Sequence, residues 1–436
     1  MARLLLKKSI IFLISFFLLC ENLIAISYSS LENTLSDIFY SYVDDNEGET
    51  TFRSLLIPFG GRSESLGTAY TGLSDDISFL RYNAGAGAVQ KETQLSLFHN
   101  TWIADSKLET IAYTTRFKNI PNLSAGSYIS CFYVPFTEYN LFGDRVASSY
   151  YTETIAAMNI SYNFLAGYDF KGLSLGATLK TGWKGIPAYT DNNDDQIISN
   201  SGLEQSTFAA MADIGLLLQF NFLKYYYSRD PNVRIGFSAQ NLGVTATGFG
   251  NQIKTGDPLP TLFTAGISLK FIKPITLTAD FTQPVNLMNT GSYILPYLSS
   301  GFSFQFTNFL TLLAGISIKG ANPRFSAGFE FEVAKIRFNF NYTLDLTTSF
   351  APFNRLSLST KVLLGDKGRS EIDRQVDEYY QLGLIHYAEA DYETAIKIWN
   401  EALKLNKRFD PAKLGIQSAQ YQIDMFRKIK ESLLLD

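Results

Sequence analysis

The stretch Leu55–Ala88 reads LLIPFGGRSESLGTAYTGLSDDISFLRYNAGAGA and differs in character from the rest of the chain. It has few runs of β-branched residues and is rich in glycine, which lets backbone turn tightly and approach other backbone closely. Asp75, Asp76 and Asn83 belong to the residue types that cap short helices and turns. The stretch is therefore predicted to be compact, irregular backbone. Because the predicted strands all come after it, we interpret it as a plug that they enclose.

Residues 90–364 follow with a sequence period of two, in which apolar and polar residues alternate, as in 325–333 and 336–346. Strict alternation gives each strand one apolar and one polar face. About fourteen such segments occur, most near the ten or so residues with which a tilted strand crosses a membrane. A soluble β-sandwich also alternates, but these segments are long and rich in aromatic residues. We therefore predict an all-β transmembrane barrel, since in lipid only a closed barrel pairs every strand edge.

The connections between the predicted strands give the barrel an orientation. An even strand count places both barrel ends in the periplasm, with long loops outside and short turns inside. Lys184–Ser206 is a long connection on the outer side, and Ile272–Pro274 is a tight one on the inner side. The polar faces then point into the lumen, where charges of both signs, such as Glu330 and Lys361, are expected to form ion pairs with each other and with the plug.

The start of the chain has the features of an export signal, predicted as residues 1–25. Lys7 and Lys8 precede the apolar run Ile10–Leu19, which is too short to span a bilayer as a helix. Lipidation of Cys20 is an alternative, although Leu19 is large where a small residue is usual. Residues 26–89 are then predicted to form an N-terminal segment followed by the plug.

The end of the chain is predicted to be a separate helical domain, residues 370–436, joined by the polar linker 365–369. Ser370 and Asp373 have the spacing of a capping box. The spacing of the following residues resembles one tetratricopeptide repeat, with packing residues Tyr379, Leu382, Gly383, Ala395, Trp399 and Ala402. A single repeat is too short for a stacked array. The domain is therefore expected to dock on the barrel base or on a periplasmic partner, or to act as a lid over the inner mouth.

Signals for chemistry are scarce in this sequence. The two histidines are His99, in the predicted strand near 93–101, and His386, in the helical domain. No Ser–His pair with an orienting third group can be nominated. Asp191–Asp195 clusters oxygen ligands but lacks the glycine and distal glutamate of a calcium loop, so a solvated outer loop is predicted. No catalytic residue, metal site or cofactor is expected, and a net charge of −4 gives no reason to propose nucleic acid as a partner.

The glycine-rich stretch carries a family resemblance, through residues that stand in a characteristic order: Arg62, Gly67, Ala69, Gly72, Asp75, Asp76, Tyr82 and Asn83. This order resembles the N-terminal region of FadL-type outer-membrane transporters and their PorV-like relatives. The chain departs after Asn83, where Ala84 replaces the usual proline. The resemblance implies an outer-membrane channel, with passive diffusion of long-chain fatty acids or other hydrophobic compounds through a plugged barrel. The alternatives are a PorV-like barrel that binds or shuttles secreted proteins, and a lipid hydrolase, which the missing triad disfavours.

If hydrophobic ligands pass the plug, the resemblance leads us to expect a defect in the barrel wall. The best candidate is the strand Ser124–Phe136, because Pro135 cannot donate to a strand ladder. The run 129–134 is apolar on both faces, which fits lipid on one side and a ligand pocket on the other. The hypothesis places Phe132 and Val134 beside the plug. The alternative is that Pro135 only marks the end of the strand.

Overall fold

The computed structural model describes residues 50–433, apart from 103–104, 119, 121, 141, 168–169, 186–205, 227, 249–252, 290–293, 320–321 and 347–352. The predicted signal peptide, Cys20, the remainder of the segment before Thr50 and the Asp191–Asp195 loop lie outside the described residues.

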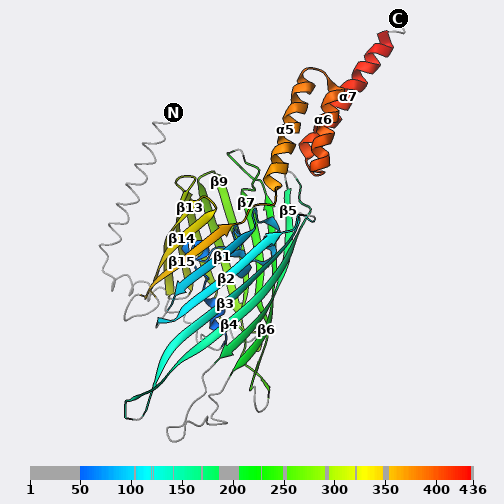
Figure 1. The fold of residues 1–436 in the computed structure, drawn as a ribbon. Helices are drawn as coiled ribbons and strands as arrows, with labels where there is room; N and C mark the ends of the chain where they lie inside the picture. The colour runs from blue at the N-terminus through cyan, green and yellow to red at the C-terminus, as the bar shows by residue number, and fades with distance from the viewer. Residues whose placement is uncertain are drawn as a thin grey trace.

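The alternating segments form a closed antiparallel barrel (Figure 1). The strands pair in chain order, except that β7 pairs with β9 because β8 is a two-residue strand beside β7. β1 pairs with β15 and so closes the ring. The ring thus has fourteen strands, and the predicted fold class is confirmed. The strands are β1 Gln94–Thr101, β2 Lys107–Arg116, β3 Leu123–Tyr139, β4 Arg145–Phe164, β5 Phe170–Gly185, β6 Thr207–Phe220, β7 Val233–Thr247, β8 Lys254–Thr255, β9 Thr261–Ile272, β10 Ile275–Val285, β11 Tyr297–Gln305, β12 Leu310–Lys319, β13 Asn322–Val333, β14 Ile336–Asp345 and β15 Phe353–Leu363.

The outward faces of these strands form an apolar belt. Large exposed side chains recur on every side of the ring, among them Leu97, Ile111, Ile129, Met158, Leu179, Ile214, Val244, Leu298, Phe340 and Leu356. Exposed phenylalanines mark the rim on the side of the helical tail, which we call the inner rim after the predicted orientation: Phe117, Phe164, Phe222, Phe306 and Phe309. An outward apolar band edged by aromatic residues is typical of barrels that span a membrane. His99 lies on this outward face beside Leu97, with its Nδ1 2.7 Å from Glu109 Oε1.

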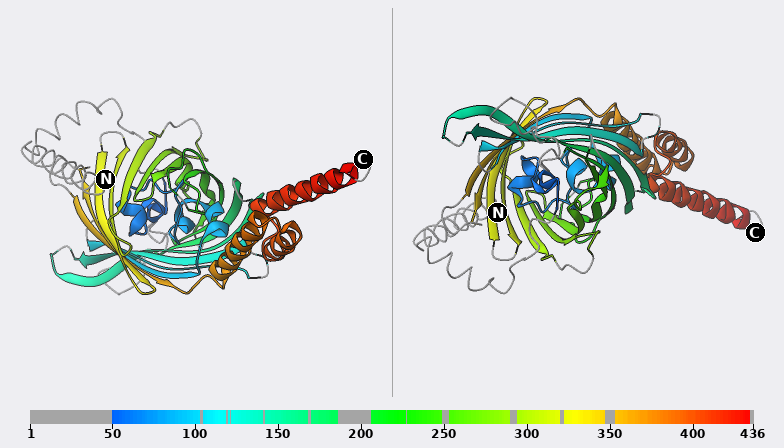
Figure 2. Two further views of the ribbon diagram at one scale, coloured as in Figure 1. Left: turned by 90° about the horizontal axis from the view of Figure 1, so that it is seen from above. Right: turned by 90° about the horizontal axis from the view of Figure 1, so that it is seen from below.

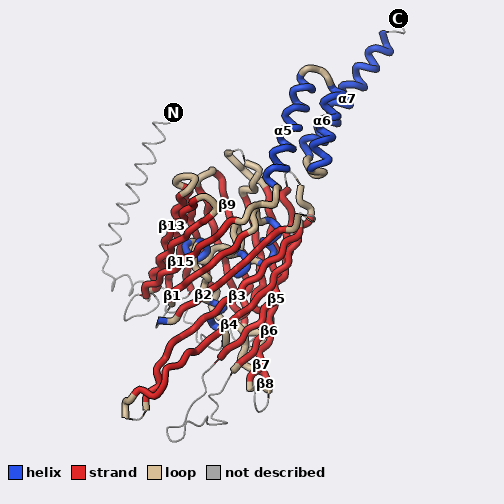
Figure 3. The backbone as a smooth tube through the Cα atoms, in the orientation of Figure 1, coloured by secondary structure: helices blue, strands red, loops and turns tan. Residues whose placement is uncertain are grey.

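The residues before β1 fill the barrel interior, as the two end-on views show (Figure 2). They form the short elements η2 Arg53–Leu56, α3 Arg62–Ser65, α4 Phe79–Tyr82 and η3 Ala84–Val89. In Figure 3 these helices lie inside the ring of strands. Nearly all side chains from Phe52 to Ala88 are buried, and Phe52, Phe59 and Phe79 join one apolar core with wall residues such as Tyr128 and Ile155. We call residues 50–90 the plug.

The chain ends in three helices, α5 Arg369–Ala388, α6 Tyr392–Leu405 and α7 Asp410–Leu433. Among the described residues, no helix has both the length and the apolar character needed to cross a membrane. Trp399 is the centre of their core: its Nε1 donates to the Tyr380 carbonyl at 3.1 Å, and Gly383 and Gly415 leave room for its ring. Ala395 and Ala402 are buried as predicted, but Tyr379 and Leu382 are exposed, because Val376 and Tyr380 take the inward positions of α5.

The predicted capping box at Ser370 does not form. Helix α5 begins one residue earlier, after Gly368, and the Asp366 carboxylate instead accepts hydrogen bonds from the backbone N–H groups of Gly368 and Ser370. The hydrogen bonds donated by the Ser370 hydroxyl and N–H lower the pKa of Asp366 to about 2. The acidic residue is thus supplied by the linker, on the other side of the helix start from the predicted Asp373.

The three helices lie beside the inner rim rather than over the inner mouth (Figure 2). Arg229, in the β6–β7 connection, pairs with Asp373 at 2.9 Å and with Asp377, and its guanidinium lies 5.8 Å from the Phe409 ring centroid. Arg408 Nη1 donates to the Ala166 carbonyl at 3.0 Å. These contacts join the helical tail to two inner connections of the barrel, so the lid interpretation does not fit the arrangement.

Replacing Arg229 with alanine is expected to loosen the tail without unfolding the barrel. The lost contacts are partly exposed ion pairs and one cation–π contact, each contributing about 1 kcal/mol or less. Limited proteolysis should then cut the linker 365–369 faster. Arg374→Ala is the matched control, because among the described residues the ion-pair partners of Arg374 are Glu371 and Glu378, both in α5. Equal cleavage rates for the two variants would show that Arg229 does not hold the tail.

Candidate functional site: the anchored plug and the outer cavity

Arg62 ties the plug to itself and to the wall. Its Nε and Nη2 donate to the two oxygens of Asp75 at 3.2 and 3.1 Å, and its Nη1 donates to Glu330 Oε1 on β13 at 3.2 Å. Burial acts to raise the pKa of Asp75, but the Arg62 and Arg234 guanidinium groups hold it well below its usual value. Two residues of the predicted motif, 13 positions apart, are thus brought together in a charge-assisted bidentate pair.

The second aspartate of the motif forms a separate anchor. Asp76 Oδ2 pairs with Lys361 Nζ of β15, and both side chains are 1% exposed. The ammonium group also lies 3.9 Å from Glu330. Asp76 Oδ1 accepts the Ser78 N–H at 2.8 Å, which starts the turn into α4. Two adjacent aspartates therefore fix the plug through two different cations.

Asn83 anchors the end of α4 to the opposite side of the barrel. Its Nδ2 donates to the carbonyls of Thr71 and Leu216, each at 3.0 Å, and its Oδ1 accepts the Gly85 N–H at 3.0 Å. An amide supplies donor and acceptor at once, which neither an aspartate nor a leucine would do. The motif asparagine therefore links two plug segments and strand β6.

Gly67 and Gly72 allow the plug backbone to touch the wall backbone. A Cβ on Gly67, whose φ is +63°, would lie 2.6 Å from the Ile316 nitrogen on β12. A Cβ on Gly72 would lie 2.7 Å from the Gly266 carbonyl carbon on β9. At both motif glycines a side chain would collide with the backbone of β12 or β9, which accounts for glycine at these two positions.

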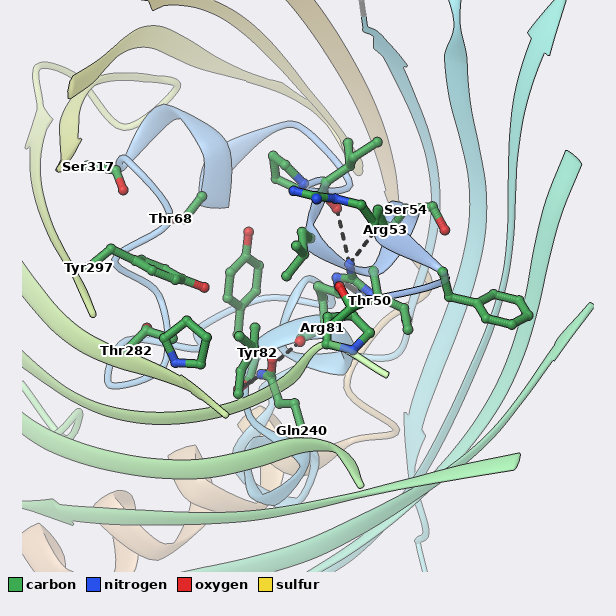
Figure 4. Close-up of a pocket in the computed structure, with 18 of the residues that line it drawn as sticks. Thr50, Arg53, Ser54, Thr68, Arg81, Tyr82, Gln240, Thr282, Tyr297 and Ser317 are labelled. Atoms are coloured by element: carbon green, nitrogen blue, oxygen red, sulfur yellow. Dashed lines mark hydrogen bonds between the residues drawn. The ribbon is translucent and has the colours of Figure 1, made fainter. Parts of the chain in front are cut away.

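A cavity of about 760 Å³ lies on the outer side of the plug, at the end of the barrel opposite the helical tail. Figure 4 shows Tyr82, Thr282, Tyr297, Ser317 and Thr68 around one part of it, where side-chain hydroxyls predominate. Another part is lined by apolar side chains from the plug and from β3 and β4. These are Phe52, Leu55, Leu56, Ile57, Pro58, Phe132 and Tyr151. The cavity therefore has a hydroxyl-rich part and an apolar part, and charged side chains such as Glu153 and Lys184 also line it.

Buried charges frame this cavity. Glu64 accepts hydrogen bonds from Asn100 at 3.1 Å and Thr343 at 3.2 Å and lies 3.8 Å from Arg355. The Arg355 guanidinium lies 3.8 Å from the Trp102 ring centroid. Arg81 donates to the carbonyls of Ser54 and Ile57 and so holds η2 and the residue after it, which border the apolar part of the cavity.

The sequence did not single out Glu64, Arg81, Trp102 or Arg355 as site residues. Glu64 and Arg81 lie within the glycine-rich motif stretch, and this location was the one feature of the sequence that could have pointed to them. Their roles depend on wall partners far away in the sequence, such as the Thr343 that donates to Glu64 across 279 positions.

The predicted path residues on β3 have different surroundings. Phe132 is 9% exposed, lines the cavity and belongs to the core that includes Leu55 and Ile57. Val134 is partly buried against the same core. Pro135 is exposed and pairs with Tyr150 on β4, and β3 continues to Tyr139. Pro135 therefore neither ends the strand nor opens the wall.

The ladders around β3 explain this outcome. β2 pairs with β3 as far as Tyr133, and β4 pairs with β3 along its whole length. Beyond Tyr133, β3 and β4 continue past the rim as a two-stranded ribbon. Pro135 thus sits in the part of β3 that has no β2 partner, a position that tolerates a missing N–H. The expected wall defect at β3 is not present in the described ladders.

The strand ladders of the barrel wall are irregular at a different place, around β6, β7 and β9 next to the cavity. The β6–β7 register shifts between Ala212 and Ile214, and the β7–β9 ladder ends at Gln240 and Leu262. Asn241, with φ of +59°, donates its N–H to Asp213, which pairs with Lys180 at 2.7 Å. Beyond this bulge, 256–260 follows β7 in place of a regular strand, and Pro260 and Leu262 line the cavity.

Fold and site together define a class: a closed fourteen-stranded barrel with an anchored internal plug and an outward cavity. Residues 33–367 match the family described as "Uncharacterised protein family (UPF0164)", and the chain belongs to this family. Similar sequences include a UPF0164 protein of Treponema pallidum (strain Nichols), 27% identical over 396 residues that cover 89% of this chain and 86% of the relative. A second UPF0164 protein of that organism is 27% identical over 399 residues, covering 86% and 76%.

Two solved structures illustrate the structural similarity. The CymD monoaromatic hydrocarbon channel has a TM-score of 0.47 at 12% identity, covering 70% of this chain and 97% of its own. The toluene transporter TodX of P. putida has a TM-score of 0.45 at 12% identity, covering 70% and 98%.

Proposed function

We propose that this protein is an outer-membrane channel that passes hydrophobic compounds, such as long-chain fatty acids, inward by passive diffusion. The observation that carries the proposal is the cavity of about 760 Å³ above the plug, with the apolar wall made by Leu55, Ile57 and Phe132. Ligand pockets are mostly apolar, with a few placed polar groups that orient the ligand. The hydroxyl-rich wall opposite suits the polar head of an amphiphile.

The route past the plug is part of the proposal. Directly below the cavity the plug is anchored to the wall by buried ion pairs, so a straight path requires the plug to move. We place a lateral exit into the lipid beside Gln240 and Leu262, where the β7–β9 ladder ends and 256–260, hydrogen-bonded to β7, would have to move aside. A lateral exit suits apolar ligands, because it avoids a water-filled route.

Uptake into vesicles tests the proposal. Purified protein reconstituted into liposomes should accelerate entry of a labelled long-chain fatty acid over protein-free liposomes, and a matched hydrophilic sugar should not enter faster. In intact cells, heat-modifiable gel migration and surface labelling of the 184–206 connection should place the barrel in the outer membrane. A periplasmic, soluble protein, or equal fatty-acid entry with and without protein, would contradict the proposal.

A second candidate function is binding of a periplasmic or secreted protein through the tail, as in PorV-like barrels. The observation in its favour is a groove of about 390 Å³ between α5 and α7, floored by Trp399 and lined by Tyr380, Leu384 and Leu414. Deleting residues 370–436 should leave the barrel assembled, because the tail core is separate from the strand ladders. Unchanged fatty-acid uptake by this variant would assign the tail a separate role, whereas loss of barrel insertion would make it structural.

A further inference from the structure

The inner rim of the barrel repeats one local pattern. At five of the six connections at this end, all but the β11–β12 connection, an exposed apolar residue stands next to a lysine in sequence: Phe117–Lys118, Phe170–Lys171, Leu223–Lys224, Ile272–Lys273 and Lys335–Ile336. These connections join β2 to β3, β4 to β5, β6 to β7, β9 to β10 and β13 to β14, so the pattern runs around the ring. The outer end carries both signs in its described connections, with Asp105, Asp144 and Asp257 near Arg145 and Lys254.

Three of these lysines are exposed and unengaged. Within the part of the chain that the structure describes, the ammonium groups of Lys118, Lys273 and Lys335 have no hydrogen-bond or ion-pair partner. By contrast, Lys224 donates to carbonyls of its own connection and Arg229 pairs with the tail. The free lysines belong to three separate connections, so their placement does not come from one local fold.

The neighbours of these lysines fix their height on the barrel. Phe117 is 41% exposed and Ile272 is 46% exposed, and both lie at the inner edge of the apolar belt. A lysine beside such a residue can lay its methylene stem along the acyl region and hold its charge at the headgroup level. Basic groups at this level attract anionic lipid headgroups.

We propose that the inner rim binds anionic phospholipid headgroups of the periplasm-facing leaflet through Lys118, Lys273 and Lys335, each acting with its adjacent apolar side chain. The inference rests on the proposed placement in an outer membrane and extends it to the lipid partner. Charge complementarity selects the headgroup: a zwitterionic lipid offers each lysine a phosphate with a competing ammonium, whereas phosphatidylglycerol offers the phosphate alone.

Native mass spectrometry of the full-length protein tests this directly, with phosphatidylglycerol and phosphatidylcholine of equal chain length as competing probes. The wild type should retain phosphatidylglycerol preferentially, and the preference should fall as salt rises. The triple variant Lys118→Gln, Lys273→Gln, Lys335→Gln should lose this preference, with a decrease of about fivefold for each lysine that is replaced.

The matched control changes the same number of charges away from the inner rim: Arg145→Gln, Lys254→Gln and Lys428→Gln, of which the first two lie at the outer end and the third on α7. Heat-modifiable migration shows that each variant is folded. A triple variant that keeps the wild-type preference, a control that loses it equally, or a wild type with no preference would each overturn the inference. Because lipid retention is measured without transport, a failure of fatty-acid uptake is a separate result.

Discussion

Replacing Lys361 with methionine is expected to lower the free energy of unfolding by about 3–5 kcal/mol, because it leaves the buried Asp76 carboxylate without its cation. Asp76 would keep a negative charge at a site where its side chain is 1% exposed, with Glu330 nearby. Urea unfolding followed by heat-modifiable gel migration measures the loss. A current across planar bilayers should also rise, because a plug released from β15 leaves the lumen open.

The double variant Lys361→Met, Asp76→Asn is the control for this prediction. Neutralising both partners removes the uncompensated charge, so most of the lost stability should return. A single variant that unfolds at the wild-type urea concentration would show that this ion pair does not anchor the plug. A double variant as unstable as the single one would assign the effect to packing rather than to charge.

Replacing Ser317 with tryptophan is expected to reduce uptake of hydrophobic compounds by about tenfold, equivalent to about 1.4 kcal/mol of binding. Ser317 is a small residue of β12 that lines the cavity, as Figure 4 shows, and an indole there would occupy space that a ligand needs. Fatty-acid entry into liposomes, normalised to the amount of folded barrel, measures the effect.

Leu312→Trp is the matched control, because Leu312 lies on the same strand but is 44% exposed on the outward face. It should insert and transport as the wild type does. If both tryptophan variants transport equally, ligands do not pass through this cavity. If both fail, the strand rather than the cavity has been damaged.

The barrel was predictable because alternation is a local signal. The alternation in 336–345 predicts apolar residues outward and polar ones inward, and the structure gives the strand Ile336–Asp345 with Asn339, Asn341 and Thr343 buried. The length of β3 was not predictable. Pro135 was taken as a wall defect or a strand end, yet the strand continues, because its pairing there involves β4 alone.

The plug residues were identifiable by type but not by partner. Asp75 and Asp76 were recognised as a pair, yet one binds Arg62 in the plug and the other binds Lys361, 285 positions away. The sequence does not show which wall residue will face a plug residue, because these contacts exist only once the barrel has closed around the plug. The same reason hid Glu64 and Arg355. In the tail, Tyr379 was predicted to pack inward, whereas the neighbouring Tyr380 does so. A difference of one position turns the inward face of α5 by about 100°.

The central claim is that hydrophobic chains occupy the outer cavity. Photocrosslinking of the reconstituted wild type with a long-chain fatty acid that carries a photoreactive group near its tail tests it most directly. Mass spectrometry of the labelled peptides should find label on the plug segment 52–58 and on β3 at Phe132, and excess unlabelled fatty acid should remove it. Label confined to outward residues such as Ile129 and Met158, or no label that competes, would contradict the claim.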